Sequence, residues 1–266
     1  MKKFVRRTMM FLCLLIFSQT ISAQETLVPI MSPYYLIGGS KNGKWLTAET
    51  IAAQIKEKTA MVTVDVKGIG KSAVVLENTG EEFGACPENT VMKMMPEIES
   101  GIAVGENAKW NLVPRLPQSI AVTDKIYTKI AADFLKTKGI VRPKINLSQV
   151  LQIDLEGDGQ NEILITGNFY KNGRIQSQVA GDYSFALLRR IVKGKARNIL
   201  IEGEFFTKRG DYEPPYDREI AAVADLNGDG KMEIVLHTTY YEGSWEQVLE
   251  ISGGKLIKVL EVSCIL

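Results

Sequence analysis

Two segments of the chain repeat the same acidic pattern in the same register, 71 residues apart. The first runs from Asp154 to Leu164 with the sequence DLEGDGQNEIL, and the second runs from Asp225 to Val235 with the sequence DLNGDGKMEIV. Asp, Leu, Gly, Asp, Gly, Glu and Ile recur at matching positions. An internal repeat indicates one supersecondary unit that is used twice, so this pattern constrains the fold of the whole C-terminal half.

Each acidic segment lies between two apolar runs, and the residues after Pro143 show no helical period. Short apolar runs bounded by turn residues are typical of β-strands. The sequence therefore predicts four strands followed by four more. The expected strands are Gln149–Asp154, Glu162–Asn168, Tyr183–Ile191 and Asn198–Glu204 in the first unit, and Glu219–Ala224, Glu233–Tyr240, Glu246–Ile251 and Leu256–Val262 in the second.

The N-terminal half has a mixed pattern. Alternating apolar residues and an Asn-Gly turn predict strands near residues 34–39, 44–46, 61–66 and 72–76, with a short helix that Thr47 caps and that continues to Lys56. Residues 77–99 are rich in Gly, Pro, Asn and acidic residues, so we expect a loop there.

A longer helix is predicted from about Asp124 to Lys138, because apolar residues recur on one face at helical spacing. Thr123 is the expected N-cap. We expect this segment, residues 121–142, to connect a mixed α/β region at 24–120 to a β-repeat region at 143–266. The expected fold class is α+β and mostly β, with two four-stranded antiparallel blade-like repeats in the C-terminal half.

The first 23 residues have the features of a secretory signal peptide. Four Lys and Arg residues precede an apolar run from Met9 to Phe17, and small residues follow up to Ala23. The run is shorter than the roughly 20 residues that span a bilayer. We therefore expect cleavage near Ala23 and a periplasmic, cell-surface or secreted product with no transmembrane segment.

The net charge bears on the possible partners, and the cysteines bear on a possible disulfide. Without residues 1–23 the chain has 28 Lys and Arg against 31 Asp and Glu, which is a net charge of −3 and disfavours nucleic acid. Cys86 and Cys264 remain after cleavage, and an oxidising compartment allows a disulfide between them. Two free buried thiols are an equally good interpretation of the sequence.

The spacing of oxygen-bearing side chains in the acidic segments suits a calcium-binding loop. Ca²⁺ takes roughly six to eight oxygen ligands, and side chains at loop positions 1, 3, 5 and 9 with the carbonyl of position 7 can converge on one ion. Gly at position 6 permits the sharp turn. The predicted ligands are Asp225, Asn227, Asp229, the Lys231 carbonyl and Glu233 in the second loop, and Asp154, Glu156, Asp158, the Gln160 carbonyl and Glu162 in the first.

The helix–loop–helix calcium motif is excluded, because position 12 is Ile165 or Leu236 instead of Glu and the flanks are predicted strands. The chain instead resembles the FG-GAP and VCBS repeats of integrin-like β-propellers and bacterial exported proteins, over about residues 145–262. The resemblance rests mainly on the DLNGDG sequence from Asp225 to Gly230. It implies blade-like repeats with structural Ca²⁺. The chain departs from that family in having Glu at position 9 of both loops, Glu156 at position 3, and two visible copies where a closed propeller has about four to eight blades.

Other functions stay open at this point. Asp-Gly turns also occur between strands because they tolerate positive φ. The sequence contains no recognisable catalytic constellation, and its one histidine, His237, lies in an apolar strand. Aromatic residues at 211–217 and 240–245 suit contact with a protein or carbohydrate partner. We expect an interaction module, with an exported hydrolase whose site lies in the N-terminal half, or a structural envelope protein without a ligand, as the alternatives.

Overall fold

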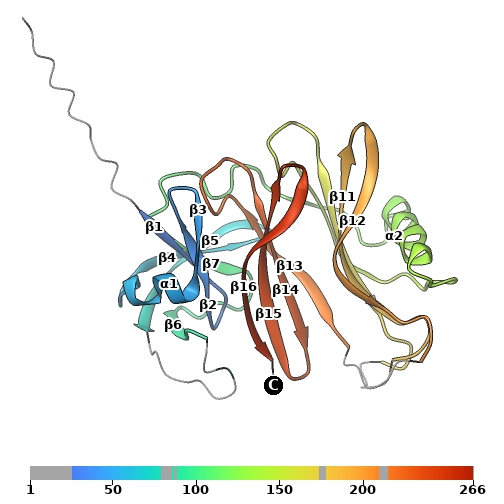
Figure 1. Ribbon diagram of the computed structural model, residues 1–266, viewed down its shortest axis with the longest axis horizontal. Helices are drawn as coiled ribbons and strands as arrows, with labels where there is room; N and C mark the ends of the chain where they lie inside the picture. Colours follow the sequence, from blue (N-terminus) through green and yellow to red (C-terminus); the bar gives the residue numbers. More distant parts are fainter. Residues whose placement is uncertain (1–25, 79–85, 87–88, 174–177, 210–214, 266) are drawn as a thin grey trace, which may run out of the picture.

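The computed structural model describes residues 26–78, 86, 89–173, 178–209 and 215–265. It contains three antiparallel β-sheets that lie side by side (Figure 1). The fold is α+β and mostly β, as predicted, because the described residues form many strands and only two short α-helices. The expected signal peptide lies outside the described residues.

Both four-strand repeats are formed as up-and-down meanders. The strands of the first repeat are β9 (Leu147–Ile153), β10 (Glu162–Phe169), β11 (Tyr183–Val192) and β12 (Lys195–Phe205). Those of the second are β13 (Asp217–Ala224), β14 (Glu233–Tyr240), β15 (Gly243–Ser252) and β16 (Lys255–Ile265). A two-residue strand, β8 (Gln118–Ser119), pairs with β9 and makes the first repeat a five-stranded sheet. The acidic loops connect β9 to β10 and β13 to β14, so they occupy equivalent places.

The N-terminal region forms a sheet of seven strands in the order β3-β2-β1-β7-β4-β5-β6. The bounds are β1 Leu27–Met31, β2 Leu36–Lys41, β3 Lys44–Thr47, β4 Ala60–Asp65, β5 Gly68–Asn78, β6 Met92–Met95 and β7 Ile102–Gly105. The sheet curls back on itself, because the N–H of Leu36 at the start of β2 donates to the carbonyl of Thr90 just before β6, at 3.0 Å.

Part of the predicted loop at residues 77–99 is therefore wrong, since β6 lies within it. The strand alternates buried Met92 and Met94 with exposed Lys93 and Met95, and the two buried methionines fill the interior of the curled sheet. Strands β1 and β7 were not predicted either. Each is short, and β1 contains Pro29, which weakens the sequence signal of a strand.

The sheet of β13–β16 lies between the other two, and both of its faces are buried (Figure 1). One face packs on the N-terminal sheet, with Val235 and Leu260 against Val28 and Val104. The opposite face packs on β9–β11 through a second apolar cluster. Burial on both faces explains why β13 and β14 contain the unbroken apolar runs Ile220–Ala224 and Ile234–Leu236, which do not alternate with polar residues.

Helices cover the two outer sheets. The short helix α1 (Ala48–Ile51), followed by the 3-10 turn η1 (Ala52–Gln54), packs on the N-terminal sheet through Ile51. The longer α2 (Lys125–Thr137) covers the outer face of β9–β12 (Figure 1). No helix in the described part of the chain combines the length and apolarity needed to cross a membrane.

The N-cap of α2 is one residue later than predicted. The carboxylate of Asp124 accepts hydrogen bonds from the N–H groups of Ile126 (2.7 Å) and Tyr127 (3.4 Å), so Thr123 is not the cap. Both residues are acceptable caps by type, but a carboxylate also interacts favourably with the positive end of the helix dipole.

A disulfide joins Cys86 to Cys264, with an S–S distance of 2.04 Å. It links the segment that precedes β6 to the end of β16. Close by, the Asn89 side chain donates to the carbonyl of Ser263 at 2.7 Å. The disulfide thus resolves the two interpretations of the cysteines and ties the last strand of the chain to the N-terminal sheet.

Candidate metal site

The loop between β13 and β14 is organised around the carboxylate of Asp225. Its Oδ1 accepts from the N–H of Gly228 at 2.7 Å, and its Oδ2 accepts from the N–H of Gly230 at 2.9 Å. Both glycines have φ near +80°, a conformation in which a Cβ would be strained. The repeated glycines therefore exist to let the backbone curl around this carboxylate.

The next predicted ligands shape the turn. Asn227 Oδ1 accepts from the N–H of Asp229 at 2.9 Å, and Asp229 Oδ1 accepts from the N–H of Lys231 at 2.8 Å. Asn227 is buried like Asp225, whereas Asp229 is exposed. The loop thus holds Asp225 and Asn227 in its interior and leaves Asp229 exposed to solvent.

Glu233, the predicted ligand at position 9, closes the loop from the start of β14. It is 1% exposed, and its Oε2 accepts from the N–H of Leu226 at 2.7 Å. Burial raises the pKa of Glu233 to about 9, and the neighbouring charges of Asp229, Asp225 and Glu250 act in the same direction. Burial also raises the pKa of Asp225, against the hydrogen bonds from Gly228 and Gly230. This loop therefore buries two carboxylates where a positive charge would favour their ionised forms.

The first loop repeats the same backbone arrangement. Asp154 accepts from the N–H groups of Gly157 (2.7 Å), Asp158 (3.2 Å) and Gly159 (2.9 Å). Asp158 accepts from the N–H of Gln160 at 2.8 Å. Glu162 is 3% exposed and accepts from the N–H of Leu155 at 3.0 Å, in the same way as Glu233. Burial raises its pKa.

Two arginines distinguish the first loop from the second. The Arg190 guanidinium forms an ion pair with Glu156, so the predicted ligand at position 3 already has a cationic partner. Arg115 lies beside Asp154. Burial by itself would raise the pKa of Asp154, but the three backbone N–H donors and the charge of Arg115 outweigh burial, and the pKa is lowered. The first loop is therefore supplied with positive charge by two arginines from other parts of the chain.

The segment between β7 and β8 supplies one side chain that donates to the first carbonyl of each loop. Trp110 donates from Nε1 to the carbonyl of Asp225 at 2.8 Å, and its ring lies against Gly228. Arg115 donates from Nε to the carbonyl of Asp154 at 2.6 Å, and its guanidinium lies against Gly157. Neither residue could be predicted from the sequence, because no local pattern marks a partner that lies 39 positions from Arg115 or 115 positions from Trp110.

The two loops also contact each other. Arg115 donates from Nη2 to the carbonyls of Leu155 (3.2 Å) and Gly230 (2.9 Å). The N–H of Met232 donates to the carbonyl of Leu155 at 2.8 Å. The predicted ligand sets thus lie at one common edge of the molecule, with Arg115 between them.

Oxygen atoms of Asp, Asn and Glu side chains are the ligands that Ca²⁺ prefers, so the residue types of the second loop fit this ion. In the described residues, however, no three His, Cys, Asp or Glu side chains are already gathered as a metal site. The oxygens of Asp225, Asn227 and Asp229 instead accept backbone N–H groups of the loop itself.

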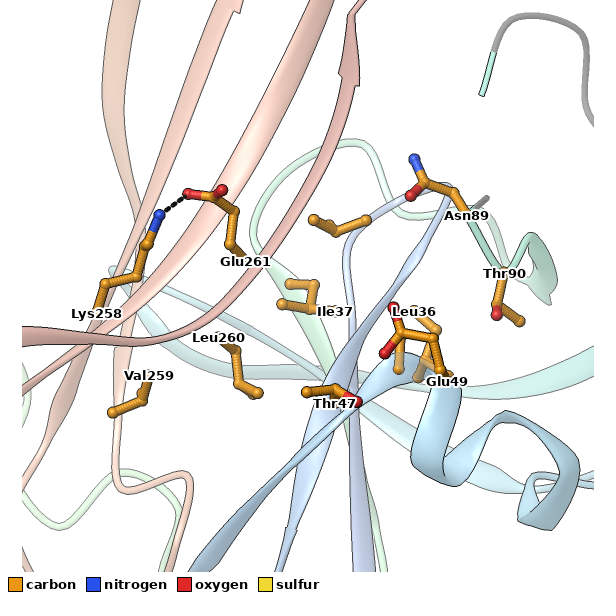
Figure 2. Close-up of a pocket in the computed structure, with 12 residues that line it drawn as sticks. Leu36, Ile37, Thr47, Glu49, Asn89, Thr90, Lys258, Val259, Leu260 and Glu261 are labelled. Carbon is orange, nitrogen blue, oxygen red and sulfur yellow. Dashed lines mark hydrogen bonds and ion pairs between the residues drawn. The ribbon is translucent and has the colours of Figure 1, made fainter. Parts of the chain in front are cut away.

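A separate hollow of about 200 Å³ lies between the N-terminal sheet and β16 (Figure 2). It contains two carboxylates, Glu49 and Glu261. A hydrogen bond from Thr47 and the N–H of Glu49 itself lower the pKa of Glu49. Glu261 pairs with Lys258. Neither group is held in the protonated form that a general acid needs near neutral pH.

His237, the one histidine, is hydrogen-bonded through Nδ1 to Glu246 Oε1 at 2.9 Å. Burial lowers its pKa, but the hydrogen bond and charge of Glu246 outweigh this and raise it.

Of the two aromatic segments, residues 211–214 lie outside the described residues. Tyr216, Tyr240 and Trp245 form one ring cluster with centroid distances of 5.7–6.4 Å.

No model of a known protein family matches the chain, and no curated protein or solved structure matches it. The assignment of a function therefore depends on the geometry of the loops and sheets.

Proposed function

We propose that this is an exported calcium-binding β-repeat protein in which Ca²⁺ stabilises the acidic loops. One observation carries the proposal: the second loop buries Asp225 and Glu233, with Asp229 beside them. Among the described residues no ion pair involves any of these three acids. Buried carboxylates without a cationic partner are costly, and a bound cation removes that cost.

In this proposal Asp225, Asn227, Asp229, the Lys231 carbonyl and Glu233 hold the ion. Ca²⁺ supplies positive charge to the buried carboxylates and joins the start of β14 to the end of β13. Its role is structural, because the loop connects two strands of the sheet on which both other sheets pack. Arg190 and Arg115 already give the first loop positive charge, so we propose the second loop as the tighter site.

The stiffened repeats then present their loops to a protein or carbohydrate partner outside the cell. Extracellular calcium modules bind with a Kd of roughly 10⁻⁴–10⁻³ M. At about 1 mM Ca²⁺ and a Kd near 0.1 mM, one site adds about 1.4 kcal/mol to the free energy of unfolding.

The test is a thermal melt of residues 24–266 in Ca²⁺, in Mg²⁺ and in excess chelator, together with calorimetric titration of Ca²⁺. We expect a Ca²⁺-specific rise in Tm that Asp225→Asn abolishes. Asp154→Asn should reduce it less, and Glu57→Gln, at an exposed acid of the N-terminal region, should leave it unchanged.

Melting curves that coincide in all three solutions would overturn the calcium proposal and leave the loops as ordinary turns. That outcome would favour a structural protein without a ligand. A larger loss with Asp154→Asn than with Asp225→Asn would reverse the order of the two loops.

A further inference from the structure

The interface between the two repeats contains, at the end of β13 away from the acidic loop, a buried charged cluster that the calcium loops do not use. Arg218 near the start of β13 has a fully buried side chain, and its Nη2 pairs with Glu204 Oε2 at 2.6 Å and with Glu202 Oε1 at 3.4 Å. Both glutamates lie on β12, so the cluster bridges the two sheets. Their side chains are 22% and 30% exposed, which places them toward solvent.

Most of the donor capacity of Arg218 is unused. Within the described part of the chain, its Nε and Nη1 atoms are buried and have no hydrogen-bond partner. A guanidinium carries five N–H donors, and leaving several of them buried and unpaired is costly. Such groups in a native protein indicate an absent partner, which is either water or a ligand.

Two aromatic rings connect this arginine to one of its own glutamate partners. The Arg218 guanidinium lies over the Tyr216 ring at 5.3 Å, and Tyr216 packs edge-on against Trp245 at 5.7 Å. Trp245 Nε1 in turn donates to Glu202 Oε2 at 3.3 Å. Beyond Trp245, Tyr240 and the 49% exposed Tyr241 extend the aromatic surface outward.

A cavity of about 320 Å³ lies beside the same arginine. Apart from Arg218 its lining consists of polar side chains, namely Ser148, Gln149, Asn168, Asp217 and Glu219. A pocket of this composition suits a ligand with many hydroxyl groups better than an apolar one.

Charge decides which class of polar ligand fits. An anion would meet Glu202 and Glu204, whereas a cation would have to compete with Arg218, which already holds both carboxylates. A neutral hydroxyl group accepts from an arginine N–H and donates to a carboxylate, so it satisfies both. The C–H faces of a sugar ring also pack well on tyrosine and tryptophan rings.

We propose that the cavity beside Arg218, together with the adjoining cluster of Arg218, Glu202, Glu204, Tyr216 and Trp245, binds a neutral saccharide; this combined site is called the inter-repeat cleft. This inference deepens the proposed interaction function by naming the class of partner. It does not require Ca²⁺ in the loops, because none of the five residues belongs to a loop ligand set.

The test is affinity electrophoresis of residues 24–266 through gels that contain one soluble polysaccharide each: a mixed-linkage β-glucan, a xylan, a galactomannan or a soluble starch. Polygalacturonate gels and added choline provide the anionic and cationic alternatives. Every gel is run with Ca²⁺ and again with excess chelator, so that a failure of calcium binding is distinguished from a failure of saccharide binding.

We expect retardation by at least one neutral polysaccharide. Trp245→Phe and Tyr241→Ala should each weaken it by a factor of about three to ten. Trp45→Phe is the matched control, because Trp45 donates to Glu250 away from the cleft and its loss should leave retardation unchanged. Unchanged thermal melts would show that the variants are folded.

Migration that none of the four neutral gels slows would overturn the proposal and assign water to the free N–H groups of Arg218. Retardation that survives both Trp245→Phe and Tyr241→Ala would place the saccharide elsewhere and overturn the proposal as well. If polygalacturonate alone retards the protein, the ligand is an anion and the proposal is wrong. If choline abolishes the retardation by a neutral gel, the site prefers a cation and the proposal is also wrong.

Discussion

The backbone N–H of Met232 donates to the carbonyl of Leu155 at 2.8 Å, so the end of the second acidic loop is fastened to the first. Arg115 strengthens this link by donating to carbonyls of both loops. The two loops are therefore one mechanical unit, and a change in either one is transmitted through backbone hydrogen bonds.

Replacing Arg115 should weaken this unit. Arg115→Ala leaves the carbonyls of Asp154, Leu155 and Gly230 without their side-chain donor, and we expect a loss of about 1–3 kcal/mol in the free energy of unfolding. Urea denaturation in excess chelator measures it. Arg142→Ala, at an exposed arginine, is the control, and an equal loss in both variants would contradict the role of Arg115.

Alanine substitutions at two glycines of the second loop distinguish the cost of backbone strain from the cost of steric contact. Gly228 and Gly230 have φ of +82° and +84°, but a Cβ on Gly228 would lie 2.9 Å from the Trp110 ring, whereas one on Gly230 would have nothing within 4 Å. Both alanine variants should lose roughly 1 kcal/mol through strain, and Gly228→Ala should lose more because Trp110 must move. Equal losses by chemical denaturation would mean that Trp110 does not pack tightly on the loop.

The buried acid of the second loop predicts a pH dependence. Because the folded state raises the pKa of Glu233 from 4.5 to about 9, its contribution to stability is fully present below pH 4.5 and is lost as pH rises through 9. The calcium-free protein should therefore lose stability between pH 5 and pH 9, and Glu233→Gln should lose less over the same range. Saturating Ca²⁺ should reduce the slope, since metal binding releases the proton.

Urea denaturation at several pH values, with and without chelator, measures this dependence. His237 also has a raised pKa and loses its contribution as pH rises, so the relevant quantity is the difference between wild type and Glu233→Gln. Parallel curves for the two proteins would show that Glu233 ionises normally.

The disulfide should contribute strongly to stability. Cys86→Ser, Cys264→Ser and the double variant should each lose about 2–5 kcal/mol, because the bond closes a long segment of chain. Equal losses in the three variants are expected, together with a Tm that reductant lowers in the wild type alone. A wild-type Tm that reductant does not change would contradict a stabilising bond.

The acidic loops and the eight strands of the repeats could be predicted from sequence because their signals are local. Asp225 with Gly228 and Gly230 encodes its own turn, and β14 has the predicted bounds, Glu233–Tyr240. The N-cap of α2 shows the limit of such reasoning, since Thr123 and Asp124 are both good caps and the final choice depends on how the chain enters the helix.

Features that depend on distant partners could not be predicted. Trp110 and Arg115 lie in an irregular segment, and their roles arise from loops that follow much later in the chain. Strand β6 lies in a Pro- and acid-rich stretch, and it forms because Met92 and Met94 fill the curled N-terminal sheet. In the same way, Arg218 on its own resembles any strand-edge arginine until β12 places two glutamates beside it.

The bond between Cys86 and Cys264 divides the polypeptide into a covalent ring and a tail. Everything from β6 to most of β16 belongs to the ring, so a protease that cuts one turn there leaves both pieces attached. Strands β1–β5 precede Cys86 and are held by hydrogen bonds and packing alone, although β1 lies inside the N-terminal sheet between β2 and β7. If the protein is exported as proposed, the first segment of the chain is the part that a single proteolytic cut can release.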